Sequence, residues 1–168
     1  MTAWREQGRS KTEAVAQKIY DPEDVGALER LFAKGVSQKD YSGEWNYDLG
    51  FSVLLWNGKN ETLSINCGLY SSVPALSNAV ILKIPKSFDV KSIDNTRRLI
   101  AAFVAAWDPD WVAVTAQSKL NHAGTDQHGR NQPFLDRGLY MKSSQRNPAF
   151  SSDVIEVRFG SGLVFLQN

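Results

Sequence analysis

Residues 50–68 read GFSVLLWNGKNETLSINCG, and this stretch decides the fold. Alternate side chains fall on opposite faces in both of its halves, residues 51–56 before Asn57-Gly58 and residues 63–67 after it. Asparagine and glycine both tolerate the positive φ angles that tight hairpin turns require. The stretch therefore predicts a β-hairpin, and its loop can exceed two residues because residues 59–62 are polar.

A strand and a helix follow the hairpin. NAVILKIP, residues 78–85, is predicted to be a third strand that ends at Pro85, because proline has no N–H to donate to a ladder. The clearest helix extends over about residues 92–107, where apolar side chains recur at helical spacing. Pro109 ends it, since the residue before a proline avoids the helical conformation. We expect this helix to pack across the sheet.

Two short helices are predicted before the hairpin. Ser10-Lys11-Thr12-Glu13 is a capping box, and Asp21-Pro22-Glu23-Asp24 is a second start signal with Asp21 as the cap. Gly35 is a plausible stop. Further short strands are expected near residues 111–115, 139–142, 154–159 and 163–166. The fold class is α+β, a mostly antiparallel sheet with N-terminal helices and one central helix (about 92–107) packed on it, in one domain covering residues 1–168.

The composition excludes several classes of protein. Lys and Arg number 19 against 18 Asp and Glu, a net charge of +1, so the chain lacks the basic excess of a nucleic-acid-binding protein. The single cysteine, Cys67, excludes an internal disulfide and a zinc cluster of thiolates. Neither a secretory signal nor a run of roughly 18 apolar residues is present. We therefore expect a cytoplasmic protein with no membrane contact and no cofactor.

The segment AAWDPDWVAV, residues 105–114, poses the question of catalysis, because Asp108 and Asp110 flank a proline. Paired carboxylates perform acid–base chemistry when a substrate lies between them. These two stand only two residues apart at a helix-to-strand corner, where aspartates favour turns and face solvent. We expect a rigid corner whose tryptophans, Trp107 and Trp111, join the core and whose aspartates face outward.

Two metal sites are alternatives. His122, Asp126 and His128 lie in one polar loop and could form an open three-ligand site, although a solvated loop is the simpler interpretation. Asp110 follows a proline as in the nuclease signature PD…(D/E)xK, but the downstream segment Glu156-Val157-Arg158 has arginine where that signature has lysine. The alternative function is thus a metal-dependent hydrolase or nuclease that uses Asp110 or the histidine loop.

A different kind of site is indicated by KDYSGEWNYDLG, residues 39–50, which mixes aromatic and acidic side chains. Exposed Trp and Tyr beside Asp and Glu are common anchors of protein interfaces. Glu44, Trp45, Tyr47 and Asp48 are the candidates here. The competing interpretation is that the aromatic side chains fold back over the sheet.

Several segments, taken in order, resemble the immunity protein 52 family of bacterial polymorphic-toxin systems. No single motif carries the resemblance; the ordered set does, and it covers nearly the whole chain. The segments are TAWREQGRSKTEAVA (2–16), GFSVLLWNG (50–58), LSINCG (63–68), NAVILKIP (78–85), AAWDPDWVAV (105–114) and GLYMKSS (138–144).

The resemblance implies a non-enzymatic inhibitor. Members of the family are thought to be encoded beside toxins with a restriction-endonuclease-like nuclease domain and to protect the producing cell by binding the toxin. Such a partner is basic along its DNA path, so complementary acids would speed encounter and fix the register. The candidate toxin-binding residues are Glu44, Trp45, Tyr47, Asp48, Asp108 and Asp110, with Asp126 a lesser candidate.

Overall fold

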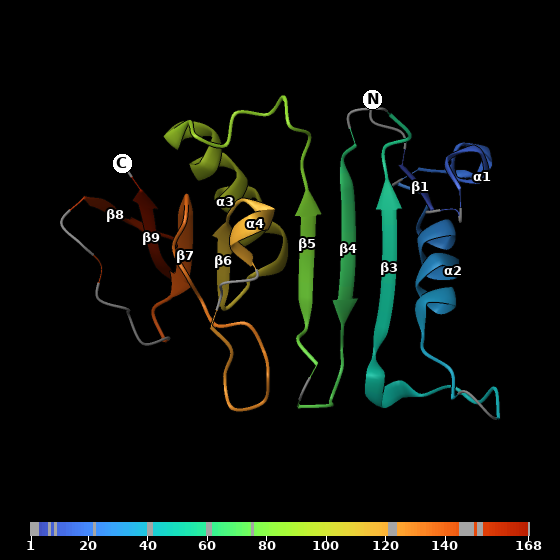
Figure 1. Ribbon diagram of the computed structural model, residues 1–168. Helices are drawn as coiled ribbons and strands as arrows, with labels where there is room; N and C mark the ends of the chain where they lie inside the picture. The colour runs from blue at the N-terminus through green and yellow to red at the C-terminus, as the bar shows by residue number, and fades with distance from the viewer. Residues whose placement is uncertain are drawn as a thin grey trace. The chain divides into compact units, whose positions relative to one another are not determined.

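The structure is a computed structural model of residues 1–168. It describes all of them except 1–3, 7, 9, 22, 40, 41, 60, 61, 75, 121–123, 145–149, 151, 152 and 168. The chain forms two compact units, Met1–Phe88 and Asp89–Asn168, each with its own sheet (Figure 1).

The first unit is built on an antiparallel sheet of order β2-β1-β3-β4-β5. The predicted hairpin lies at its centre, with Val53 opposite Cys67 and Trp56 opposite Ser64. Asn57 closes the hairpin, since its N–H donates to Leu63 O (2.9 Å) and its side-chain Oδ1 accepts from Leu63 N (3.1 Å). The strands are β1 (Trp4–Glu6), β2 (Ile19–Tyr20), β3 (Phe51–Trp56), β4 (Ser64–Leu69) and β5 (Ala79–Lys83).

The helices of this unit are α1 (Lys11–Ala16) and α2 (Val25–Gly35). Ser10 caps α1 as the capping box predicts, by accepting from Glu13 N (3.2 Å). The prediction that Asp21 caps the second helix is wrong. Asp21 instead accepts from Glu23 N two residues on, which forms a local turn. Asp24 is the cap of α2 and accepts from Ala27 N (2.9 Å).

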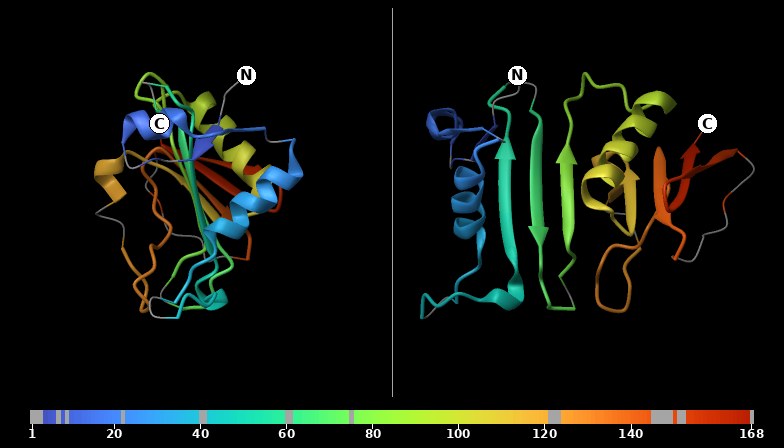
Figure 2. Two further views of the ribbon diagram at one scale, coloured as in Figure 1. Left: turned by 90° about the vertical axis from the view of Figure 1, so that its right-hand side faces the viewer. Right: turned by 180° about the vertical axis from the view of Figure 1, so that it is seen from behind.

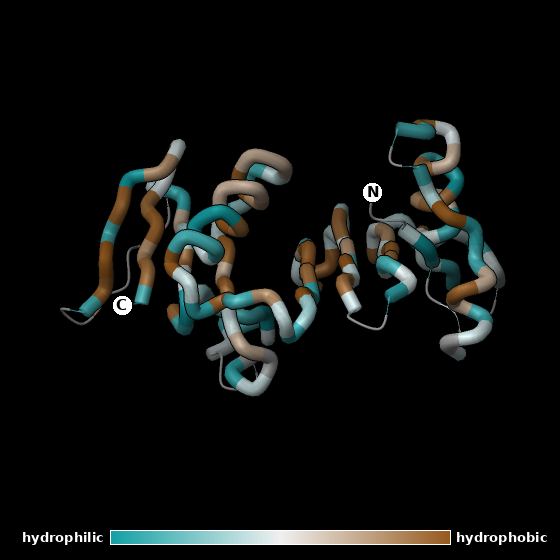
Figure 3. Tube along the Cα trace, turned by 90° about the horizontal axis from the view of Figure 1, so that it is seen from above, coloured by the Kyte–Doolittle hydropathy of each residue, from teal (hydrophilic) through white to brown (hydrophobic). Residues whose placement is uncertain are grey.

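The core of the first unit lies between α2 and β3. Ala27 and Leu31 of α2 are buried together with Tyr20 and Val53. In both α2 and α3 (Ile93–Trp107), the main helix of the second unit, hydrophobic residues are interspersed with hydrophilic ones (Figure 3). One face of α2 can therefore be buried while the other meets water.

The second unit is an antiparallel sheet of order β6-β7-β9-β8 with α3 packed on one face. α3 (Ile93–Trp107) matches the predicted central helix within one residue at its start. Its Ile100 is fully buried against Tyr140, Val164 and Leu166, and the opposite face of the sheet buries a second cluster. The strands are β6 (Trp111–Val114), β7 (Gly138–Lys142), β8 (Val154–Phe159) and β9 (Gly162–Gln167), and a short helix, α4, spans Gln117–Leu120.

The predicted α+β class with antiparallel strands is confirmed. The strands, however, divide between two sheets, and the central helix packs on the second of them instead of on the hairpin. Among the helices that the structure describes, none has both the length and the apolar composition needed to cross a membrane.

Candidate functional site

The segment between α2 and β3 folds into a small antiparallel loop. Gln38 and Trp45 form an isolated β-bridge, and Lys39 N donates to Glu44 O at 2.8 Å. The Lys39 ammonium also forms an ion pair with the Glu44 carboxylate at 3.1 Å, although 68% of the Glu44 side chain stays exposed. The loop therefore holds Glu44 and Trp45 side by side on the surface of the first unit.

A short 3-10 helix, η1 (Tyr47–Leu49), follows this loop and leads into β3. Tyr47 is 71% exposed, so its side chain does not fold back over the sheet, whereas Trp45 is half-buried. Asp48 is fastened to the segment after β4, because Ser72 N donates to Asp48 O (2.9 Å) and Ser72 Oγ donates to Asp48 Oδ1 (3.2 Å). These two bonds bring the turn of η1 against the β4–β5 connection.

Tyr70, in that connection, was not found by reasoning from the sequence. Its side chain is 79% exposed and its backbone has a φ of 63°, a left-handed conformation that is uncommon for a bulky residue. Its ring lies 5.9 Å from the ring of Phe51, which in turn lies 5.2 Å from Phe32. The one signal in the sequence was an aromatic residue directly before the turn-forming segment Ser71-Ser72-Val73-Pro74.

The segment that ends in η1 and the β4–β5 connection meet at one end of the first unit, where β3 begins and β4 ends (Figures 1 and 2). Residues 42–50 and 69–78 together contain two acids and no lysine or arginine. We refer to the following six residues as the aromatic–acidic surface: Phe32, Glu44, Trp45, Tyr47, Asp48 and Tyr70.

Asp108 and Asp110 lie in the second unit, at the corner between α3 and β6. Asp108 ends α3 in the left-handed conformation (φ 42°), and its N–H donates to Val104 O at 3.1 Å. Its carboxylate accepts from the Lys142 ammonium at 2.7 Å, and this hydrogen bond raises the pKa of Lys142 above its usual value. The carbonyl of Asp110 accepts from Lys142 N at 2.9 Å. The prediction that a helix-to-strand corner carries both aspartates on its exposed side is confirmed.

The prediction that both tryptophans of this corner join the core is wrong for Trp107, which is 44% exposed. Val104 is the last residue of α3 in the core cluster, and the final turn of the helix lies beyond it in solvent. Trp111, on β6, does pack against the cluster of Leu139 and Met141.

Asp126 organises a turn in the second unit. Its carboxylate accepts from the N–H groups of His128 (2.8 Å) and Arg130 (3.0 Å), and it forms an ion pair with the Arg130 guanidinium at 2.7 Å. These bonds, the backbone one from Arg130 foremost, lower the pKa of Asp126 to about 2. His122 lies outside the described residues. Within the described part of the chain, no three His, Cys, Asp or Glu side chains form a group that could hold a metal ion.

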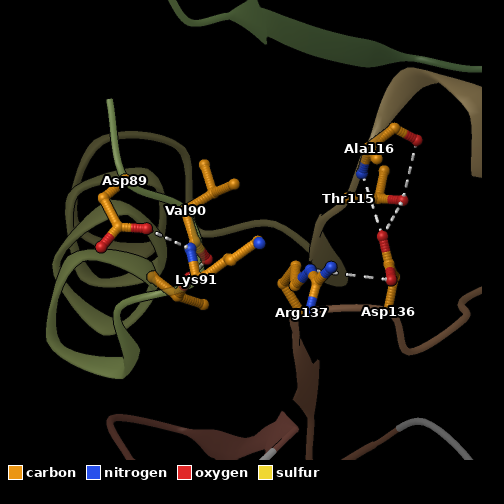
Figure 4. A network of polar contacts seen from close by, with 8 residues as sticks. Asp89, Val90, Lys91, Thr115, Ala116, Asp136 and Arg137 are labelled. Carbon is orange, nitrogen blue, oxygen red and sulfur yellow. Dashed lines mark hydrogen bonds and ion pairs between the residues drawn. The ribbon is translucent and has the colours of Figure 1, made fainter. Parts of the chain in front are cut away.

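Another carboxylate of the second unit, Asp136, is only 15% exposed and has a structural role (Figure 4). It accepts from Thr115 Oγ1 (2.9 Å) and from Ala116 N (3.0 Å), while the Arg137 guanidinium lies 4.0 Å away. Asp136 thereby fastens the end of β6 to the segment before β7. Its contacts are those of a structural clamp, with both oxygens facing partners of the same unit.

The nuclease-like combination of Asp110 and Glu156 is not assembled within the second unit. Asp110 immediately precedes β6 and Glu156 lies on β8, and two strands separate these two in the sheet. Three interstrand spacings of about 4.8 Å put roughly 14 Å between them, too far to share one metal ion. Cys67 is buried in the first unit, and burial raises the pKa of its thiol, as expected of an inert core cysteine.

Comparison with known protein families gave a match. A family model described as Immunity protein 52 matches residues 1–154, which include the whole first unit and most of the second. No curated protein matches the chain.

Proposed function

The chain belongs to the immunity protein 52 family, as the order of its segments predicted, and on that premise we propose that it binds and neutralises a cognate bacterial toxin. The toxin we propose is a nuclease of the restriction-endonuclease fold. Neutralisation would proceed by non-covalent association in the cytoplasm, where a DNA-cutting toxin acts. The chain would take no part in catalysis and would need no cofactor.

The observation that carries the proposal is the aromatic–acidic surface of the first unit. Exposed aromatic side chains are the residues that most often supply binding energy at the centre of protein interfaces. Tyr47 and Tyr70 are more than two-thirds exposed, although tyrosine is usually at least partly buried in a folded protein. A partner that covers them would remove a large apolar area from water.

The acids of the same surface suit a nuclease. Such an enzyme carries lysine and arginine along the path of the DNA backbone, because phosphate contacts dominate its affinity. Asp48 would meet those cations and accelerate encounter, and Glu44 would do so while sharing its carboxylate with Lys39. The chain itself has a net charge of +1, so we propose no direct binding of nucleic acid.

Asp108, Asp110 and Asp126 are proposed as further toxin contacts on the second unit. Asp110 acts on Lys142 only through its charge, whereas Asp108 and Asp126 form ion pairs with Lys142 and Arg130. A toxin that used Asp108 or Asp126 would have to share the carboxylate with that intramolecular cation. We therefore rank Asp110 first among the three.

The test is co-expression of this chain with the toxin encoded immediately beside it, followed by purification of the pair. Survival of the cells together with a stable complex supports the proposal. The association rate should also fall as salt rises, because the proposed steering charges are exposed. Continued killing without a complex would overturn the proposal. Hydrolysis and metal-binding assays on variants of Asp110, His122, Asp126 and His128 would then examine the alternative enzyme.

A further inference from the structure

We propose that Tyr70 is the central anchor of the toxin contact, and that the toxin presents to it an apolar side chain flanked by arginine or lysine. This inference rests on the proposed function and identifies its partner chemistry. It shifts the centre of the interface from the acidic residues to an aromatic side chain that the sequence does not single out.

The backbone on the C-terminal side of Tyr70 is held firmly. Ser71 N donates to Asn78 Oδ1 at 2.8 Å, and Asn78 Nδ2 donates back to Ser71 O at 3.3 Å. Ser71 Oγ also donates to Asp48 O at 3.1 Å. The chain is thus fixed on both sides of the connection while the Tyr70 side chain projects outward, 79% exposed. A residue whose backbone is already fixed in this way loses little backbone freedom when a partner covers it.

The conformation of Tyr70 also favours a binding role. A φ of 63° is adopted readily by glycine and tolerated by asparagine, whereas a tyrosine there is strained. Strain of this kind clusters at sites where the side chain has a function. Tyr70 contributes little to burial of the core, so its contact with Phe51 does not by itself account for an aromatic residue at this position.

Tyr70 is connected to a larger aromatic surface. Its ring packs near that of Phe51, and the Phe51 ring packs near that of Phe32, which is itself 41% exposed. Tyr47 lies in η1, whose Asp48 is bonded to Ser72 two residues after Tyr70. Tyrosines suit such a role because they offer a large contact area with only two side-chain torsions to fix.

The charges around Tyr70 favour a partner with basic side chains. The two segments that build this end, residues 42–50 and 69–78, contain Glu44 and Asp48 and no lysine or arginine, and Lys39, outside them, pairs with Glu44. Asp48 therefore leaves this end with a net negative charge, which disfavours a phosphate or an acidic peptide as the partner. An arginine or lysine, in contrast, is attracted both by the carboxylates and by the faces of exposed tyrosine rings.

The experiment compares Tyr70→Asn with Val25→Asn by calorimetric titration against a catalytically inactive form of the toxin encoded beside this chain. Val25 is 65% exposed at the first turn of α2 and serves as the matched control. We expect Tyr70→Asn to weaken binding by about 30-fold or more, as removal of an interface hot spot does. Val25→Asn should bind like the wild type.

Two further measurements make the result specific. Tyr70→Asn should be at least as resistant to urea as the wild type, because asparagine tolerates this φ, so lost affinity cannot be ascribed to unfolding. Tyr70→Phe should retain affinity within a few-fold if the ring is the anchor. Tyr70→Asn binding as tightly as the wild type would overturn the inference while leaving the proposed function intact.

Other outcomes separate the two proposals. If the wild-type chain itself fails to bind the toxin, the proposed function fails and this inference with it. If the wild type instead forms dimers that Tyr70→Asn abolishes, the surface joins two copies of this chain, and the inference is overturned.

Discussion

Gly50 is the position where one added methyl group should do most harm to the aromatic–acidic surface. It lies between η1 and β3 with φ 66° and ψ −145°, close to a region that essentially only glycine populates. A Cβ built on Gly50 would lie 2.1 Å from Leu69 O and 2.7 Å from Ser71 N, and both are backbone atoms. The substitution Gly50→Ala therefore combines an unfavourable backbone conformation with a clash that no side-chain rotation relieves.

The expected loss can be built from these two effects. Holding a residue with a side chain in such a conformation costs about 1–3 kcal/mol. Forcing an extra carbon into a filled space costs about 1–3 kcal/mol as well. Gly50→Ala should therefore lower the free energy of unfolding of the first unit by roughly 2–6 kcal/mol, which is a large part of the total stability of a small domain.

Gly43 provides the matched control. Its φ of 68° is nearly the same, but a Cβ there meets no atom within 4 Å among the residues that the structure describes. Gly43→Ala should cost only the conformational term, about 1–2 kcal/mol. Urea unfolding followed by circular dichroism measures both variants, and with a slope of about 1–3 kcal/mol per molar the Gly50→Ala midpoint should lie clearly below that of Gly43→Ala. Coincident midpoints would refute the close approach of the two backbones.

Three further predictions concern the rest of the molecule. Tyr20 is buried beside β1 and donates a hydrogen bond to Glu6. Burial, and after it this hydrogen bond, raise the pKa of Tyr20 to about 12. The stability that Tyr20 contributes below pH 10 should therefore be lost as the pH rises towards 12, and urea unfolding of Tyr20→Phe should not show this loss. Because its pKa is lowered to about 2, Asp126 should stabilise its turn above about pH 4 and cease to do so as the pH falls towards 2. Carbon-detected NMR of Arg130→Gln should find the midpoint raised only part of the way to 3.8, because this variant keeps the backbone hydrogen bonds to Asp126. Ile100→Ala should destabilise the second unit by about 2–5 kcal/mol in thermal unfolding, since Ile100 is fully buried, and an unchanged melting temperature would contradict the packing of α3 on its sheet.

The elements that could be predicted from the sequence are those whose pattern is long enough to repeat. The hairpin of β3 and β4 has two alternating runs around Asn57-Gly58, and α3 has four turns of apolar spacing before Pro109. β1 and β2 have three and two residues, which is too few for alternation to be recognised. Their pairing depends on contacts between distant residues, such as Arg5 with Trp56. No local pattern contains that information.

The division of the strands between two sheets could not be predicted from the sequence for a related reason. Alternation specifies which face of a strand is buried, but it does not specify which other strand pairs with it. Gly138 illustrates the missing information. A Cβ on this residue would lie 2.5 Å from Thr96 Cγ2, so β7 and α3 approach each other closely at this point. Such an approach is a property of the folded unit, and the glycine that begins GLYMK gave no sign of it.

The candidate site was predicted in part. Glu44, Trp45, Tyr47 and Asp48 form an exposed group as their mixed composition suggested, because a polar and aromatic segment between two regular elements has no core position to occupy. Tyr70 could not be recognised, since it directly follows a strand and resembles one more strand residue. Tyr70 has a positive φ at the end of β4, and the bonds of Ser71 to Asn78 and Asp48 follow directly after it.

The contacts of the carboxylates finally suggest how the proposed toxin contacts differ from one another. Asp108 and Asp126 are each bonded to a cation of their own unit, at 2.7 Å in both cases. The charge of each of these carboxylates is offset by its own cation, so the pair presents little net charge to attract a toxin lysine. Asp48 accepts only from neutral serine groups among its described contacts, and its charge is therefore still available to a cationic partner. Asp48→Asn should accordingly slow association with the toxin more than Asp126→Asn does, and the difference should shrink as salt is added. Equal effects of the two substitutions, measured by stopped-flow at low salt, would mean that intramolecular pairing does not govern which acids the toxin uses.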